Sequence, residues 1–261
     1  MAKPSLSTIE LTHRPDETVA TMLLNRPERL NALSRNVLRE IVVACRWLDE
    51  TEAIKAVVVR GSGRAFSAGF DLDDFTSLDA ETSPRDTADL GRLAAEALTD
   101  VRPLTVAAIH GHCVGGGLVL AAACDLRLAS DTVRFSIPEV DLGIPLAWGG
   151  IPRLARELGP AITKELVLTC RPFGADEARS LRFLNRVVAE DELFAEADAL
   201  AAELAGKPAF SLRATKLHVN AVMEEIAGTR RNANDADTLA AALTDEESRR
   251  TARDYLRSKR R

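Results

Sequence analysis

Three consecutive glycines, Gly115 to Gly117, constrain the fold more than any other feature of this sequence. They follow the apolar run TVAAI at residues 105–109, which predicts a buried strand. They precede the uncharged run LVLAAA at residues 118–123, which predicts a helix. Because glycine weakens a helix, three of them at its start require either an unusual backbone conformation or a close approach by another group. The segment therefore predicts a strand, a sharp turn and a helix that begins with bare N–H groups.

Short apolar strands alternate with helical patterns along the first 190 residues, and helical patterns alone follow from residue 191. Strands are expected at residues 7–11, 18–24, 56–60, 105–109, 125–129 and 133–135. Helices are expected after the N-cap Ser34 and at residues 90–101, 118–123, 149–158, 161–168 and 175–181, with a loop at 73–86. The sequence therefore predicts an α/β fold with a core over residues 1–190 and a helical region over residues 191–261.

The composition of the chain excludes several classes of protein. Of 261 residues, 46% are hydrophobic and 28% are charged, which is typical of a globular domain and not of a disordered chain. The formal net charge of −5 argues against nucleic acid as a partner, and no apolar run reaches the roughly 18 residues that cross a membrane. The four cysteines form no C-x-x-C pair, which favours free thiols in a reducing compartment and hence the cytoplasm.

Glycine-rich turns before helices often bind phosphate, but this turn lacks the residues of both common phosphate motifs. A P-loop needs Lys and then Ser or Thr after its last glycine, where this chain has Leu118 and Val119. A dinucleotide fingerprint needs glycine at its sixth position, where the chain has Leu120. A second glycine-containing turn, residues 63–71, also follows a buried strand, and such turns open on one edge of a parallel sheet. Together the two turns predict a site for an oxyanion that develops during a reaction.

Four motifs, in order along the chain, carry a specific resemblance. They are LNRPERLNALS, RAFSAGFDL, HGHCVGGGLVLAAACDLRLAS, and FSIPEVDLGIP followed by GGIPRL. Over residues 5–225 the chain resembles the enoyl-CoA hydratase/isomerase (crotonase) superfamily. The resemblance implies a spiral of ββα units and a C-terminal helical region that forms trimers and covers the active site. It also implies homotrimers or hexamers of two trimers, an acyl-coenzyme A thioester as substrate, and no cofactor apart from the coenzyme A of that substrate.

Carried over by motif, the resemblance assigns three catalytic residues. The N–H groups of Ala68 and Gly116 are expected to stabilise the oxygen of a thioester enolate, and Glu139 is expected to move a proton. The second carboxylate of the family's hydratases falls at Val119, which can neither hold nor activate water. The chain is therefore expected to move the double bond of 3-enoyl-CoA to give 2-enoyl-CoA. A hydratase with a non-standard second group and a non-catalytic acyl-CoA-binding protein are the alternatives.

Further residues are expected to contact the substrate. Arg29 and Lys216 are candidates for binding the phosphates of coenzyme A, although ordinary surface charge explains both equally well. Trp148 either shortens the acyl pocket or fills the core. The full set of expected substrate-binding residues is Arg29, Ala68, Gly69, Phe70, Asp71, Gly115, Gly116, Val119, Trp148 and Lys216.

Two other kinds of site fit the sequence less well. Ser67 lies in a near match to the G-x-S-x-G turn of serine hydrolases, for which His218 is the only late histidine. His110, His112 and Cys113 have side chains that could bind a metal, but no second ligand pair stands at a fitting spacing. We therefore expect neither a serine nucleophile nor a metal.

Overall fold

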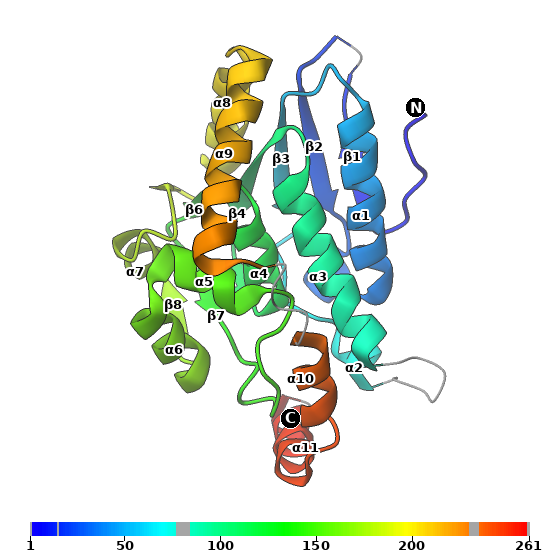
Figure 1. Cartoon of the computed structure of the whole chain (residues 1–261), viewed down its shortest axis with the longest axis vertical. Helices are drawn as coiled ribbons and strands as arrows, with labels where there is room; N and C mark the ends of the chain where they lie inside the picture. The colour runs from blue at the N-terminus through cyan, green and yellow to red at the C-terminus, as the bar shows by residue number, and fades with distance from the viewer. Residues whose placement is uncertain (1, 15, 77–83, 230–234, 260–261) are drawn as a thin grey trace.

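The computed structural model describes residues 2–14, 16–76, 84–229 and 235–259 (Figure 1). Within these residues, the main sheet has six strands in the order β1-β2-β3-β4-β6-β9. They are β1 (Ile9–Thr12), β2 (Val19–Leu24), β3 (Ala56–Gly61), β4 (Leu104–Ile109), β6 (Leu126–Ser130) and β9 (Arg186–Val188). The β1–β2 pair is antiparallel and the other pairs are parallel. A smaller sheet, in the order β5-β7-β8, contains β5 (His112–Val114), β7 (Arg134–Ser136) and β8 (Phe173–Gly174).

Helices and loops connect the strands, and helices predominate after β9. The helices that precede β6 are η1 (Pro27–Arg29), α1 (Arg35–Glu50), α2 (Leu72–Thr76), α3 (Pro84–Asp100) and α4 (Gly116–Ala123). Those that follow it are α5 (Gly150–Leu158), α6 (Pro160–Thr169), α7 (Ala175–Ser180), α8 (Leu193–Ala205), α9 (Ala209–Ala227), α10 (Asp235–Ala242) and α11 (Glu246–Lys259). Ser34 caps α1 as expected, since its side chain accepts a hydrogen bond from Val37 N–H (3.3 Å).

The main sheet separates two apolar cores, and successive side chains of β3 and β4 point alternately into one core and the other. Val57 and Ala107 face the larger core, which also contains residues of α1, α3 and α4. Val58 and Val106 face the smaller core, which α8 completes. All four side chains are fully buried, as expected for parallel strands that are covered on both faces. The first helix of the predicted C-terminal region is thus one of the layers that cover the sheet.

The parallel strands bring the two glycine-containing turns to one edge of the sheet. β3 and β4 are neighbours, and residues 62–71 follow β3 while residues 110–117 follow β4. The carboxyl ends of parallel strands lie on the same edge, which is where α/β proteins bind ligands. The order strand, turn and helix predicted from the three glycines is confirmed for β4 and α4.

Two segments differ from the sequence-based expectation. The loop predicted at residues 73–86 is wrong at both ends, because α2 begins at Leu72 and α3 begins at Pro84. Residues 77–83 of that range lie outside the described residues. The segment 110–117, expected to be a turn, also contains β5, whose three residues are too few to show a strand pattern. No helix in the described part of the chain has the length and apolar character needed to cross a membrane.

Candidate active site

Backbone hydrogen bonds join the two glycine-containing turns. Ser67 N–H donates to His112 O (3.0 Å), and Val114 N–H donates to Ser67 O (3.0 Å). Gly69 packs so closely on the second turn that a Cβ atom added to it would lie 2.8 Å from Val114 O and 3.7 Å from Gly116 N. The backbones of the two turns therefore meet, and the absence of a side chain at residue 69 is what allows them to do so.

The segment LNAL at residues 30–33 occupies the other edge of the first turn. Ala68 N–H donates to Leu30 O (2.9 Å), and Leu33 N–H donates to Gly69 O (2.8 Å). Asp71 N–H donates to Leu33 O (3.2 Å). The predicted role of Ala68 as an oxyanion donor is therefore wrong, because its N–H group is already bound to a backbone carbonyl.

Phe70 supplies the free N–H group of the first turn. Backbone groups alternate along an extended segment, so Gly69 O and Asp71 N–H on one edge place Phe70 N–H on the opposite edge. Among the described residues, no group accepts a hydrogen bond from Phe70 N–H or from Gly116 N–H. Gly116 is the first residue of α4, where N–H groups lack partners in the helix and the helix dipole favours negative charge. Phe70 and Gly116 therefore each supply a free donor, one from each turn.

Asn31, for which no role was predicted from the sequence, holds the first turn in place. Its φ of 55° lies in the left-handed region that asparagine adopts more readily than most residues. Its buried side chain donates to Ser62 O (2.8 Å) and Ala65 O (2.7 Å), and its Oδ1 accepts from Arg26 N–H (2.9 Å). The polar residue inside the LNAL motif is the sequence signal that could have identified this role.

Glu139 lies directly over the second turn. Gly115 N–H donates to Ser136 O (2.9 Å), which ties this turn to the end of β7, and Glu139 follows three residues later. A Cβ atom added to Gly115 would lie 2.3 Å from Glu139 Oε1. Gly115 also has φ 49° and ψ −116°, a backbone conformation that only glycine adopts readily. Glycine at this position therefore permits both the turn and the approach of the carboxylate.

The carboxylate of Glu139 forms no ion pair with a described residue. Oε2 is enclosed and has no hydrogen-bond partner among the described residues, although the residue as a whole is only partly buried. Burial raises the pKa of Glu139 to about 7, although a hydrogen bond from its own backbone N–H acts to lower it. A carboxyl with a pKa near neutral pH can both accept and return a proton.

Val119, which stands at the position of the family's second carboxylate, packs against apolar neighbours. Val119 is fully buried, and its Cγ2 lies 2.9 Å from where a Cβ atom on Gly150 would be. Contact between Val119 and an acyl group stays a prediction. Two other acids lie near the turns or near Glu139 in the sequence. Asp141 is exposed, and Asp74 accepts a hydrogen bond from Arg35 N–H (2.6 Å). Neither replaces the missing carboxylate.

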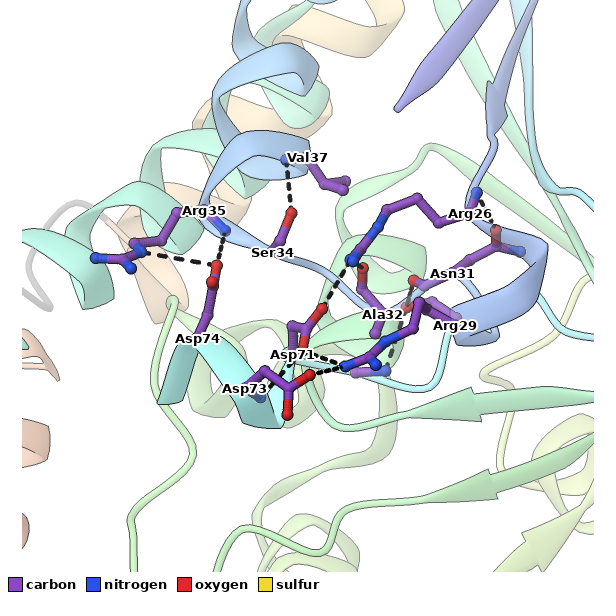
Figure 2. Close-up of polar contacts among 12 residues, drawn as sticks. Arg26, Arg29, Asn31, Ala32, Ser34, Arg35, Val37, Asp71, Asp73 and Asp74 are labelled. Atoms are coloured by element: carbon purple, nitrogen blue, oxygen red, sulfur yellow. Dashed lines mark hydrogen bonds and ion pairs between the residues drawn. The ribbon is translucent and has the colours of Figure 1, made fainter. Parts of the chain in front are cut away.

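An ion-pair cluster orders the residues after Phe70, as Figure 2 shows. Asp71 is buried and binds Arg26 (2.8 Å) and Arg29 (3.2 Å), while Arg29 also binds Asp73. Burial acts to raise the pKa of Asp71, but the hydrogen bonds from Arg26 and from Asp73 N–H hold it below its usual value. We therefore revise Asp71 from a substrate-binding residue to one that positions the turn. Contact between Arg29, which is exposed, and coenzyme A stays a prediction.

Lys216 lies at the opposite end of the sheet from the two turns. Its Nζ binds Asp125 (2.8 Å) and Pro103 O (3.1 Å), and its side chain is buried. Pro103 directly precedes β4 and Asp125 directly precedes β6, so both mark the amino ends of these strands. The prediction that Lys216 binds the phosphates of coenzyme A is therefore wrong for the site formed by the two turns of the same chain, because its ammonium group is held in a buried ion pair.

The rival kinds of site gain no support from the geometry. Ser67 is fully buried, and its hydroxyl donates to Asn31 O (2.9 Å), while His218 is exposed on α9. Within the described residues, no group of three or more His, Cys, Asp or Glu side chains could hold a metal ion. His110 is buried with Nε2 within hydrogen-bond distance of Gly63 O (2.9 Å), whereas His112 is exposed.

The site thus combines two features of an α/β fold: free backbone N–H donors at the carboxyl edge of the sheet, and an enclosed carboxylate beside them. A sequence profile described as enoyl-CoA hydratase/isomerase matches residues 14–260. The chain therefore belongs to the enoyl-CoA hydratase/isomerase (crotonase) family and is an enzyme of the hydratase or isomerase type. The resemblance expected from the four motifs is thereby confirmed.

Individual relatives agree with this assignment. The chain is 40% identical over 212 residues to a probable enoyl-CoA hydratase, echA8, of Mycobacterium bovis, which covers 80% of each chain. It is 33% identical over 210 residues to a crotonyl-CoA hydratase of Syntrophomonas wolfei, again covering 80% of each. Among solved structures, an enoyl-CoA hydratase/isomerase from Mycobacterium paratuberculosis matches 96% of this chain and 100% of its own, with a TM-score of 0.88 and 26% identity.

Proposed function

We propose that this enzyme converts 3-enoyl-CoA to 2-enoyl-CoA through a thioester enolate. The observation that supports the proposal is the carboxylate of Glu139, whose Oε2 has no hydrogen-bond partner among the described residues, beside the free N–H groups of Phe70 and Gly116. The apolar Val119 stands where a hydratase of the family would carry its second acid. A single carboxylate suits the transfer of one proton between two carbon atoms better than the activation of water.

The reaction needs two proton transfers at the same carboxylate. Glu139 first removes a proton from C2, and the electron pair moves onto the thioester oxygen, which accepts hydrogen bonds from Phe70 N–H and Gly116 N–H. Glu139 then returns the proton at C4, and the double bond moves from C3–C4 to C2–C3. One such donor typically contributes about 100- to 1000-fold in rate. No other reactant is consumed, so coenzyme A enters only as part of the substrate.

Turnover of a 3-enoyl-CoA is the first test of this proposal. Incubation with 3-hexenoyl-CoA is expected to produce 2-hexenoyl-CoA, which is followed by the absorbance of the conjugated thioester and by mass spectrometry after hydrolysis and separation. Binding of the substrate without any product would contradict the proposal and favour an acyl-CoA-binding protein. Formation of 3-hydroxyhexanoyl-CoA as the main product would favour a hydratase.

A hydratase is the second candidate because of the relatives. The proteins from Mycobacterium bovis and Syntrophomonas wolfei are named as hydratases. If this chain shares that activity, a group other than the side chain of Val119 must hold the water. Adding 2-hexenoyl-CoA and measuring its hydration tests this alternative.

The pKa of Glu139 predicts the pH dependence of isomerisation. Glu139 must be ionised to take the C2 proton, and burial raises its pKa to about 7. We therefore expect kcat/KM to rise with pH through about 7 and to level off above it. The measurement is a kcat/KM profile for 3-hexenoyl-CoA between pH 5.5 and 9. A profile that is already flat at pH 5.5 would show that Glu139 is not the base with this pKa.

We also propose that several copies of this chain assemble, as the family resemblance implies. Helix α9 leaves apolar side chains exposed at a helical spacing, and an exposed apolar patch commonly marks an interface. These residues are Phe210, Leu217, Val219, Val222 and Ile226. Light scattering after size exclusion is expected to give the mass of a trimer or hexamer, and Val222→Asp is expected to lower it. A monomer at micromolar concentration would contradict the proposal.

A further inference from the structure

Trp148 has a backbone conformation that is costly for a bulky residue. Its φ of 62° lies in the left-handed region, and the structure around it must therefore enforce this conformation. Gly149 N–H donates to Asp235 Oδ2 (2.7 Å), and Gly150 N–H donates to Ala147 O (3.0 Å). These hydrogen bonds hold the backbone that follows the tryptophan, and they direct its side chain into the protein, where it is 6% exposed.

Two glycines on different helices make room for the indole. A Cβ atom added to Gly91 of α3 would lie 1.9–2.2 Å from Cε2, Cδ2 and Nε1 of Trp148. A Cβ atom added to Gly116 of α4 would lie 2.3–3.1 Å from Cζ3, Cη2 and Cε3. A glycine inside a helix weakens it, so Gly91 is best explained by the ring that lies against it. The indole therefore fills a slot between α3 and α4 that admits no side chain at residue 91 or 116.

The same indole touches both residues that donate to the substrate oxygen in the proposed reaction. It lies against Gly116, and it meets the ring of Phe70 edge to face, with centroids 5.7 Å apart and an interplanar angle of 88°. The Cα of Gly115 faces Glu139 and the Cα of Gly116 faces Trp148. The acyl carbons next to the thioester carbonyl must therefore lie between the carboxylate and the indole.

We propose that Trp148 is the specificity-determining residue that closes the acyl pocket and restricts this enzyme to short-chain acyl-CoA substrates. The inference rests on the proposed function for the position of the thioester. A long acyl chain would need the slot between α3 and α4, which the indole fills. A smaller side chain at residue 148 would open that slot, because Gly91 and Gly116 contribute no side chains to it.

The test compares chain lengths in the natural enzyme and in Trp148→Ala, with Trp148→Leu as a milder second variant. We measure kcat/KM for 3-hexenoyl-CoA and 3-dodecenoyl-CoA. The natural enzyme is expected to prefer hexenoyl, and the variant to raise the dodecenoyl-to-hexenoyl ratio by at least about 10-fold, since each methylene in an apolar pocket changes specificity by about that factor or more. An unchanged ratio, or a natural preference for dodecenoyl, would overturn the proposal.

Two controls show whether a change in chain-length preference comes from the acyl pocket at residue 148. Trp47 of α1 is equally buried at 6% exposure, so Trp47→Ala creates a comparable cavity and is expected to leave the ratio unchanged. If no chain length is turned over, the proposed function fails, and calorimetric Kd values for hexanoyl-CoA and dodecanoyl-CoA then test the pocket alone. The same shift toward dodecanoyl in Trp148→Ala supports the proposal, and equal Kd ratios in both proteins contradict it.

Discussion

Replacing Glu139 by Gln is expected to lower kcat for isomerisation by about 100- to 10,000-fold, the usual contribution of a general base. Glutamine keeps the size of the side chain but cannot take a proton from C2. Substrate binding should persist, because the N–H groups of Phe70 and Gly116 come from the backbone. The measurement is a full kinetic comparison with 3-hexenoyl-CoA. Asp141→Asn is the matched control, since it removes an exposed carboxylate two residues further on and should retain full activity.

The same substitution is expected to stabilise the folded protein above pH 7. Burial raises the pKa of Glu139 from its ordinary value of 4.5, which applies to the unfolded chain, to about 7 in the folded protein. The folded state therefore binds the proton more tightly, and this contribution to stability is full below about 4.5 and is lost as the pH rises through 7. At pH 8 the difference is about 3 kcal/mol, because a pKa rise from 4.5 to about 7 is multiplied by about 1.36 kcal/mol per pKa unit. A Glu139→Gln protein with full activity, or one less stable at pH 8, would contradict this role.

Replacing Gly115 by Ala is expected to abolish most activity and to destabilise the fold. The added methyl group would lie 2.3 Å from Glu139 Oε1, and the carboxylate would have to move away from the turn. Displacing the base should cost about as much as removing it, or about 100-fold or more in kcat. The positive φ of 49° should also cost about 1–3 kcal/mol of unfolding free energy for a residue other than glycine.

Gly159 provides the control that separates strain from displacement of the carboxylate. It also has a positive φ, 78°, but a Cβ atom added to it would meet nothing within 4 Å. Gly159→Ala should therefore lower the melting temperature through strain alone and leave kcat unchanged. Equal activity losses in the two variants would show that backbone strain, and not the position of Glu139, explains the effect of Gly115→Ala.

Local patterns in the sequence were sufficient to predict the layered core, and the family resemblance supplied the candidate residues of the site. The β-branched runs around Val58 and Val106 form strands because both faces of the sheet are buried, and continuous apolar runs are typical of such strands. The glycine turn between a strand and a helix predicted free N–H groups, and the family resemblance assigned the donor role to Gly116, whose N–H group has no acceptor among the described residues. The motif containing Glu139 placed the carboxylate in the right loop, and the structure brings it over Gly115.

What could not be predicted depends on partners that are distant in sequence. Hydrogen bonds to Leu30 and Leu33 decide whether the N–H group of Ala68 or that of Phe70 stays free. The turn motif alone does not show which residues of the turn form these hydrogen bonds. Lys216 reads as a surface charge within its helix, but the fold buries it against Asp125, 91 residues away. In both cases the local pattern is compatible with either outcome, and tertiary hydrogen bonds decide between them.

The most direct test of the single-carboxylate account is the ratio of isomerisation to hydration by the same enzyme preparation. We measure kcat/KM for the conversion of 3-hexenoyl-CoA to 2-hexenoyl-CoA and for the hydration of 2-hexenoyl-CoA to 3-hydroxyhexanoyl-CoA. Because Val119 cannot activate water, isomerisation should exceed hydration by at least about 100-fold, the lower range of what a general acid–base group contributes. Hydration as fast as isomerisation would contradict the account.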